Sequence, residues 1–241
     1  MYAPKTKRLF FDIETTANPE NLALAPEPKA PGNLKDPLKV AAAIEEKKRD
    51  LIDSAALDPD YGKVLSIGLS YGDGDPISVW VVGETFGPQP EPIPVLDETG
   101  EVTQYITPPP HLLSEYELIE IFWLHFADCR GNCVGYNILS FDLPFLMARS
   151  MYLGVKIPYL PILAKFRTEP VTDLYAIRYN WAPGKGLKAV CKLLGIPNEC
   201  DGMDGSQVKD MTIEQLRAYQ VSDVLLVMQL YKRMNGIYFS H

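Results

Sequence analysis

Two carboxylates stand one residue apart near the start of the chain, at Asp12 and Glu14. They end the segment 7–13 (KRLFFDI), whose apolar and aromatic residues predict a buried strand. In an extended chain, residues i and i+2 point to the same face, so both acids project together and repel each other unless a cation lies between them. The alternative for an isolated Asp-x-Glu is a solvated strand end.

Asp223 interrupts the apolar face of the last predicted helix. Apolar residues recur there at helical spacing between Leu216 and Leu230. A carboxylate at such a position is seldom buried without a partner. Tyr219 precedes Asp223 by one helical turn, so the two side chains share a face. The alternative is an amphipathic helix with Asp223 at its solvated edge.

A further carboxylate, Asp142, lies in the segment 135–146 (GYNILSFDLPFL). A strand is predicted to end here, Asn137 follows it, and Asp142 falls in the first turn of a helix. The free amides and the dipole of a helix N-terminus favour a carboxylate at that place. Taken alone, Asp142 is therefore equally well explained as a helix cap.

The elements that must position these residues begin with strands and then alternate with helices. Asn235-Gly236 is expected to end the last helix, which begins with a capping-box pattern at Thr212 and Gln215. This order predicts an α/β fold, with helices on both sides of a mixed sheet. Strands are predicted at 7–13, 64–71, 77–82, 132–136 and 171–174, and helices at 38–56, 115–128, from 140 or 142, at 187–194 and from 212.

Two long segments look like insertions. Residues 17–37 are rich in Pro, Ala and Asn and predict a loop, which together with the helix at 38–56 gives an insertion at 17–62. Residues 83–110 hold seven prolines and predict an exposed excursion, either a hairpin or an ordered loop. A chain of 241 residues is long enough for one large domain and short for two, so a single domain over 1–241 is expected.

Composition indicates a folded protein outside the membrane. Hydrophobic residues make up 46% of the chain, enough for a sizeable core. The longest apolar runs are too short to span a bilayer, and the first residues lack the apolar stretch of a signal peptide. A cytoplasmic location is therefore expected. Four cysteines fit no zinc template and are expected to be reduced thiols: Cys129, Cys133, Cys191 and Cys200.

The formal net charge of −8 argues against a nucleic-acid partner, because phosphate binding needs Lys and Arg. The charges are segregated, however. Residues 84–120 carry eight acidic groups and no Lys or Arg, and residues 151–192 carry seven basic groups against two acidic ones. Such a pattern can give one face a positive field, which makes Lys185 and Lys188 candidate substrate contacts. The alternative is two ordinary solvated surfaces.

Together, the three acidic segments resemble the three motifs of the DEDD exonuclease superfamily, in its tyrosine-containing (DEDDy) branch. Within it, the chain is most similar to the proofreading exonuclease domain of B-family DNA polymerases and to stand-alone relatives of that domain. The likeness extends from the first strand to the last helix. Asp12 and Glu14 match the first motif, Asn137, Phe141 and Asp142 the second, and Tyr219 and Asp223 the third.

The resemblance implies a ribonuclease-H-like fold and two divalent cations, Mg2+ or Mn2+. Ligands with oxygen donors alone suit such hard cations. By likeness, Asp12 would contact both ions, Glu14 and Asp223 would complete the site of one, and Asp142 would act at or near the other. Tyr219 would orient the attacking water, because a phenol with a pKa near ~10 is a poor base at neutral pH.

The activity that the resemblance implies is 3′→5′ hydrolysis of DNA to nucleoside 5′-monophosphates. Single-stranded DNA or a 3′ end is the expected partner, with replication or repair proteins as further candidates. Asn137 and Thr15 are candidate substrate contacts, whereas Phe141 is expected to pack in the core. One alternative is an exoribonuclease with the same site. The other is a non-catalytic nucleic-acid-binding module, which would not need four acids that repel phosphate.

Overall fold

The computed structural model describes residues 7–72, 75–96, 101–203 and 205–239. One sheet has five strands in the order β3-β2-β1-β6-β7. Its first three strands are antiparallel, whereas β6 and β7 run parallel to β1, so the sheet is mixed as predicted. The strand bounds are β1 Leu9–Ala17, β2 Gly62–Ser70, β3 Ser78–Val81, β6 Cys133–Gly135 and β7 Val171–Asp173.

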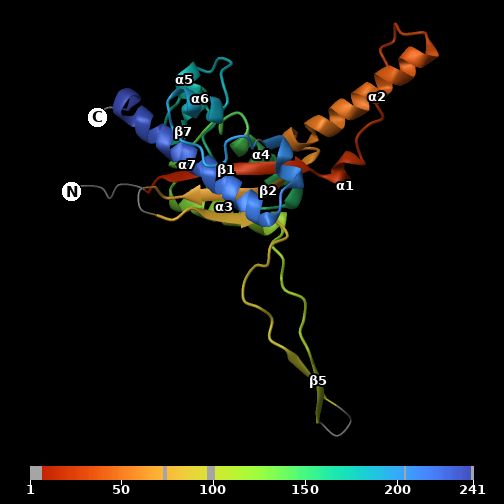
Figure 1. Cartoon of the computed structure of the whole chain (residues 1–241), viewed down its shortest axis with the longest axis vertical. Coiled ribbons are helices and arrows are strands. Elements are labelled where there is room, and N and C mark those ends of the chain that lie inside the picture. The colour runs from red at the N-terminus through yellow and green to blue at the C-terminus, as the bar shows by residue number, and fades with distance from the viewer. Residues whose placement is uncertain (1–6, 73–74, 97–100, 204, 240–241) are drawn as a thin grey trace.

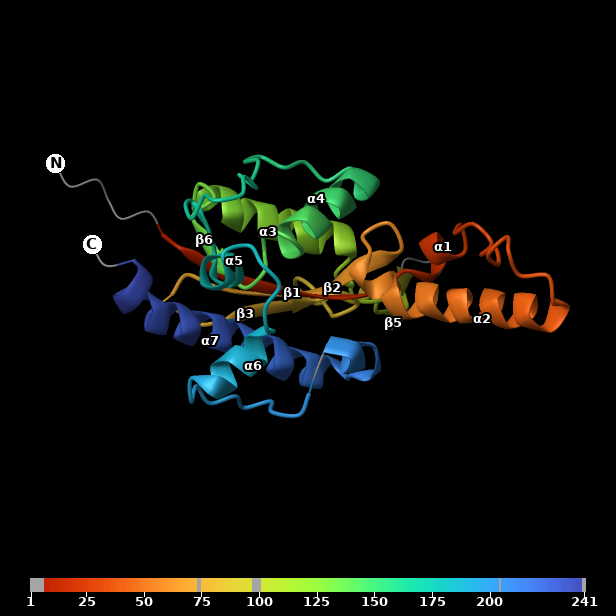
Figure 2. The same ribbon diagram turned by 90° about the horizontal axis from the view of Figure 1, so that it is seen from above.

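Helices cover both faces of this sheet (Figure 2): α3 and α4 lie on one face, and α6 and α7 on the other. The predicted capping box of Thr212 and Gln215 begins α7, and a second capping box begins α3. The bounds are α3 Glu115–Asp128, α4 Asp142–Leu153, α5 Leu174–Tyr179, α6 Leu187–Leu193 and α7 Ile213–Tyr238, with short 3-10 helices η1 Ala55–Leu57 and η2 Gly205–Asp210.

The central strand β1 contributes to two separate cores. Phe11 and Ile13 pack into the large cluster that includes Trp123 of α3. Phe10 instead packs with Val224 and other residues of α7. Because side chains alternate along a strand, the next two residues on the face of Phe10 are the two acids of the first segment. Because Phe10 packs on α7, Asp12 and Glu14 also face α7.

The parallel neighbour of β1 is much shorter than β1 itself. β6 pairs with β1 through Leu9 and Phe10 and ends at Gly135. On its other side, β1 pairs with β2 as far as Ala17, four residues beyond the predicted end of the strand. Beyond Phe10, β1 therefore has a strand on one side only, and space opens on the other side.

Two segments project from the body of the molecule (Figure 1). A helix, α2 (Pro37–Ser54), forms where one was predicted, but it buries none of its side chains. It follows a single helical turn, α1 (Pro19–Leu22). In the other projection, β4 (Ile93–Leu96) and β5 (Val102–Ile106) form an antiparallel pair. Of the two forms expected for the proline-rich segment, the hairpin is the one observed.

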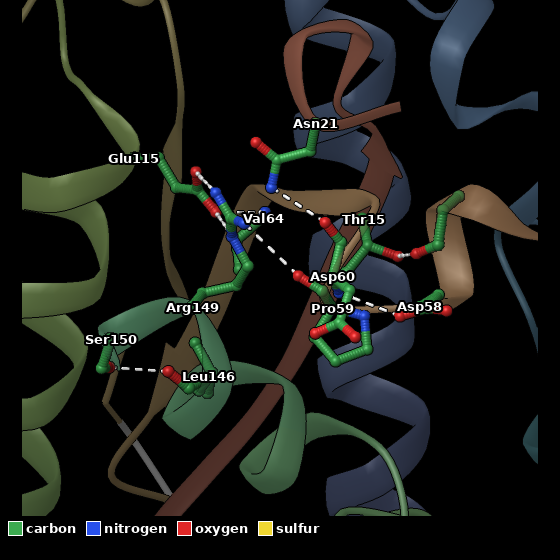
Figure 3. Close-up of polar contacts among 11 residues, drawn as sticks. Thr15, Asn21, Asp58, Pro59, Asp60, Val64, Glu115, Leu146, Arg149 and Ser150 are labelled. Carbon is green, nitrogen blue, oxygen red and sulfur yellow. Dashed lines mark hydrogen bonds and ion pairs between the residues drawn. The ribbon is translucent and has the colours of Figure 1, made fainter. Parts of the chain in front are cut away.

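The base of the α2 projection is tied to the body by polar contacts (Figure 3). Arg149 of α4 is 2% exposed and forms a bidentate ion pair with Glu115 of α3, with two N···O distances of 2.9 Å. It also donates to the carbonyl oxygen of Pro59 at 3.3 Å. The Thr15 hydroxyl donates to the carbonyl oxygen of Ala56 at 2.5 Å. The root of the projection is therefore fixed, although its helix is exposed.

The predicted end of the last helix is wrong. Asn235-Gly236 was expected to end it, but α7 continues to Tyr238. The Phe239 amide donates to the carbonyl oxygen of Asn235, and the Phe239 ring stacks on Tyr231 with 5.8 Å between ring centres. This packing carries the helix past a local termination signal. Among the described residues, no helix is long and apolar enough to cross a membrane.

Candidate active site

The space beside β1 is a cavity of about 320 Å³. Its walls come from β1, from the connection between β6 and α4, from the start of α6 and from the middle of α7. The cavity thus collects segments that lie far apart in the sequence. The predicted site residues that line it are Asp12, Glu14, Asn137, Phe141, Asp142, Lys188, Tyr219 and Asp223.

Asp12, Glu14 and Asp223 form the tightest group in this cavity. One carboxylate oxygen of each lies within 4.8 Å of the others. The first two share a face of β1, and Asp223 meets them from α7. Asp142 lies outside this trio but lines the same cavity from the first turn of α4. The N-cap of that helix is Phe141, so Asp142 is not the capping residue.

Burial raises the pKa of all four carboxyl groups, and repulsion within the cluster raises it further at Asp12 and Glu14. Burial raises the pKa of Asp12 well above its usual value, and the charges of Asp142 and Glu14 raise it further. The pKa of Glu14 rises to about 8, first through burial and then through the charge of Asp223. Burial raises the pKa of Asp142 to about 7. Crowded like charges disfavour ionisation, so the cluster favours the uptake of protons or of a cation.

The donor atoms fit a hard divalent cation. All four groups are carboxylates, with no His or Cys among them, which is the ligand set that Mg2+ and Mn2+ prefer. The Asp223 Oδ1 atom is buried and accepts no hydrogen bond within the described parts of the chain, although the Lys188 ammonium lies 3.4 Å from it. The atom therefore keeps its capacity to bind a cation. These observations are consistent with a metal site at the carboxylate trio.

Lys188 contributes one positive charge to the cavity. Its Nζ atom lies 3.4 Å from Asp223 Oδ1, which is too long for a strong hydrogen bond. It donates to the carbonyl oxygen of Met203 at 3.1 Å and lies 3.7 Å from the centre of the Tyr219 ring. Burial raises the pKa of Asp223, and the charge of Lys188 opposes that rise. The structure thus places Lys188 inside the carboxylate cluster.

Tyr219 lies in the same cavity, 3% exposed, one helical turn before Asp223. Burial raises the pKa of its phenol above the usual value, and the charges of Asp223 and Glu14 raise it further. The phenol is therefore neutral at any ordinary pH. It can hydrogen-bond to a water molecule, but it offers no phenolate to act as a base.

Gln220 is a positioning residue that the sequence reasoning missed. Its Nε2 donates to Asp12 Oδ2 at 2.8 Å, and its Oε1 accepts from Ser66 Oγ at 2.6 Å. The side chain is fully buried, so these bonds fix the orientation of Asp12. The one signal in the sequence was a polar residue at helical spacing from the apolar Leu216 and Val224.

Asp173 was also missed, and it shapes the part of the cavity wall that the connection between β6 and α4 forms. Its buried carboxylate accepts the backbone N–H groups of Asn137 and Leu139, each at 2.9 Å, and caps α5. Asn137 adopts a left-handed conformation with φ of 67°. Asp173 thus holds the turn that directs the chain from β6 into α4, where Asp142 stands. In the sequence it was marked only by its place in a predicted strand.

The predicted substrate contacts lie in different places. Asn137 lines the cavity, whereas Thr15 and Lys185 are not among its described lining residues. The Thr15 hydroxyl is engaged with Ala56. The Lys185 side chain is exposed, and its carbonyl oxygen accepts a hydrogen bond from the Tyr136 hydroxyl. Lys185 is therefore beside the cavity and not in it.

Comparison with known proteins agrees with this picture. A solved family B DNA polymerase from the hyperthermophilic archaeon Pyrobaculum calidifontis is similar, with a TM-score of 0.55 and 17% identity over 97% of this chain and 25% of the polymerase chain. This chain spans a quarter of that protein, and the likeness concerns the fold, which is ribonuclease-H-like as predicted. No curated protein matches. The model of one family, described as "Predicted 3'-5' exonuclease related to the exonuclease domain of PolB", matches residues 102–238. Because this match covers more than half of the chain, the chain belongs to that family.

Proposed function

We propose that the chain is a two-metal-ion 3′→5′ exonuclease of the DEDDy type that hydrolyses DNA to nucleoside 5′-monophosphates. The observation that carries this proposal is the convergence of four carboxylates and Tyr219, from three distant segments, on one cavity. Family membership supports the 3′→5′ direction. The oxygen-only donor set supports a pair of Mg2+ or Mn2+ ions.

The four carboxylates would hold the ions. Asp12, Glu14 and Asp223 would bind one ion, since their oxygens already lie within 4.8 Å of each other. Asp142 would help to bind the second, together with Asp12. When bound, such a pair of ions stabilises the attacking and leaving oxygens of the phosphodiester. Gln220 would keep Asp12 oriented through its bond to Oδ2.

The remaining side chains of the cavity would act on the water and the phosphate. The neutral Tyr219 hydroxyl would orient the attacking water without taking its proton. The Lys188 ammonium would hold Asp223 and the Tyr219 ring in place and would favour the negative phosphate in the cavity. Asn137 would contact the terminal nucleotide from the opposite wall.

DNA is proposed as the substrate because the family is described by its relation to a DNA polymerase exonuclease. An exoribonuclease would use the same carboxylates, so RNA is the alternative that the assay must test. A module that only binds nucleic acid is disfavoured, because four acids around one cavity repel phosphate unless cations are present.

The test uses 5′-labelled DNA and RNA oligonucleotides of the same sequence, each incubated with Mg2+, Mn2+ or EDTA. A descending ladder on DNA, absent in EDTA and with Asp223→Asn, is the expected result. A ladder on RNA alone would replace DNA as the substrate. A wild-type protein that binds both oligonucleotides and degrades neither would overturn the proposal in favour of the binding module.

A further inference from the structure

Phe166 and Trp181 form an aromatic pair on the loops that flank β7 and α5. Their ring centres lie 4.8 Å apart at an interplanar angle of 55°. Phe166 is 72% exposed, whereas Trp181 is half-buried. The indole nitrogen of Trp181 is buried and has no hydrogen-bond acceptor within the described chain. The pair therefore combines one exposed ring with one half-buried ring.

The backbone at both positions is unusual. Phe166 has φ of 66° and Trp181 has φ of 59°, a left-handed conformation that bulky residues rarely adopt. Such conformations cost free energy and persist where the surrounding structure imposes them. At Trp181 the amide donates to the carbonyl oxygen of Ala176 at 3.2 Å. The chain is thus bent at the two positions that carry the rings.

The exposed charges around this pair are mainly positive. Lys165 and Arg167 flank Phe166, and Lys185 follows Trp181 in the same loop. All three side chains are exposed, and none forms an ion pair with an acid in the described residues. The acids between 165 and 185 are Glu169 and Asp173, and Asp173 is buried on backbone amides. This surface therefore suits phosphate groups, although the whole chain is acidic.

The pair is linked to the cavity by one short loop. Residues 181–186 lead from Trp181 to Gly186, which lines the cavity. The Tyr136 hydroxyl, whose residue also lines the cavity, donates to the carbonyl oxygen of Lys185 and fixes this loop. Five extended residues reach at most about 17 Å. The pair thus lies within the length of a few nucleotides from the cavity wall.

We propose that Phe166 and Trp181 are a base-stacking platform for the single strand on the 5′ side of the nucleotide held in the cavity. Lys165, Arg167 and Lys185 contact the phosphates of that strand. The inference rests on the proposed function, because it assumes that the 3′ end of the strand occupies the cavity. Aromatic faces beside a positive surface are the means by which proteins hold unpaired bases without reading their sequence. A base-paired strand does not offer its ring faces, so the platform selects single strands.

Binding is measured by fluorescence anisotropy with 5′-labelled oligo(dT), on an Asp223→Asn background with Mg2+ so that hydrolysis does not interfere. Phe166→Ala and Trp181→Ala should each weaken binding of a strand of about twelve nucleotides by about tenfold, as loss of one stacking contact does. Binding of a strand of about three nucleotides, which reaches only the cavity, should be unchanged. Trp181→Phe keeps a ring and should retain most of the affinity. Tyr105→Ala removes an exposed ring of β5 (66% exposed) and serves as the matched control.

A second readout is the fluorescence of Trp181 itself, since stacking on a base quenches an indole. Quenching by oligo(dT) should be present in Asp223→Asn and lost in Asp223→Asn with Trp181→Phe, whose remaining indoles are Trp80 and Trp123. Equal affinity of the alanine variants and the Tyr105→Ala control would overturn the platform, even where the wild type degrades DNA. Loss of affinity in those variants, in a protein that degrades nothing, would sustain the platform and refute the exonuclease. The two ideas therefore fail separately.

Discussion

The cavity contains more negative charge than its single lysine balances. Four carboxyl groups line it beside one ammonium group, that of Lys188. Burial is the main cause of the raised pKa values of Glu14 and Asp142, and the charge of Asp223 adds to the rise at Glu14. Protons and cations would therefore compete for the same oxygen atoms, and we expect metal affinity to depend on pH.

We expect the metal-free protein to lose stability as pH rises from about 5 to about 8. Glu14 has a pKa of about 8 in the folded chain, above the usual ~4.3 of an unfolded chain. The folded state thus binds this proton more tightly. The stabilisation is complete below the unfolded pKa and is lost as pH rises through the folded pKa. Melting temperatures in EDTA across this range measure it, and Glu14→Gln should flatten the curve. An equal slope in both proteins would contradict the prediction.

Metal should reverse this loss. Mn2+ is expected to raise the melting temperature of the wild type in a concentration-dependent way, because ions bind the folded site alone. Asp12→Asn should lose most of that rise, and in EDTA it should be at least as stable as the wild type, since it removes one repelling charge. A large drop in its melting temperature in EDTA would instead indicate a buried ion pair at Asp12.

Tyr219→Phe should slow hydrolysis and leave metal binding intact. The hydroxyl is proposed to orient water, and loss of a positioned group of this kind costs roughly 10²–10⁴-fold in rate. Single-turnover rates give the chemical step, and the Mn2+-dependent rise in melting temperature gives metal binding. A mutant that turns over at the wild-type rate would remove Tyr219 from the mechanism.

The two candidate lysines should differ in their kinetic effects. Lys188 lies between Asp223 and the Tyr219 ring, so Lys188→Met should lower kcat. Lys185 is exposed, so Lys185→Met should mainly raise KM and flatten its dependence on salt. Lys192→Met, at an exposed pair with Asp201, is the control. Kinetic effects of the first two variants no larger than that of Lys192→Met would show that neither lysine acts on the substrate.

At the scale of elements, local patterns predicted some helix bounds and missed others. The helix predicted at 115–128 is observed with those bounds as α3, and the capping box of Thr212 and Gln215 marks the start of α7. The end of α7 coincides with the stacking of Phe239 on Tyr231, which no local pattern encodes. The short helix α5, which Asp173 caps, was not predicted.

The same division applies to the site. Strand alternation brings Asp12 and Glu14 to one face, and helical spacing brings Tyr219 and Asp223 to another, so each pair was visible in the sequence. The hydrogen bond from Gln220 to Asp12 joins residues 208 positions apart, and no pattern in either segment predicts it. Local periodicity thus revealed the acidic segments, whereas the groups that orient them required the fold.

The buried ion pair of Arg149 and Glu115 should be a strong link between α3, α4 and the base of the α2 projection. Arg149→Met leaves Glu115 buried without its partner, which typically costs about 3–5 kcal/mol. Urea unfolding measures this free energy. Lys48→Met, at an exposed pair with Glu45, should change it by ~0–1 kcal/mol. If Arg149→Met lowers the free energy of unfolding no more than Lys48→Met does, water takes the place of Arg149 beside Glu115.

At the scale of the whole molecule, the acidic hairpin and the basic loops near α5 project from different sides of the body (Figure 1). Residues 84–112 contain no Lys or Arg, and β5 exposes Val102, Tyr105 and Ile106. No described residue of β4 or β5 belongs to any of the three core clusters. An acidic projection repels phosphate, so the nucleic acid is expected to approach from the other side.

Removal of the hairpin should therefore leave the fold and the activity unchanged. Its two ends are held together where the Phe86 amide donates to the carbonyl oxygen of His111 at 2.8 Å, so a short Gly-Asn turn can replace residues 88–109. Melting temperature and cleavage of a single-stranded oligonucleotide are the two measurements. Loss of cooperative unfolding, or of cleavage, would show that the hairpin supports the body or the substrate.

The shortness of β6 has a consequence for the size of the opening. The strand stops at Gly135, and Asn137 turns the chain away with φ of 67°. The backbone of Ile13, which a longer strand would face, instead helps to hold the Asp142 carboxylate. Each residue added to β6 before that turn would extend the ladder and narrow the aperture. The length of β6 therefore determines the width of the cavity opening. The position at which Asn137 ends the strand pairing limits the size of the group that can enter.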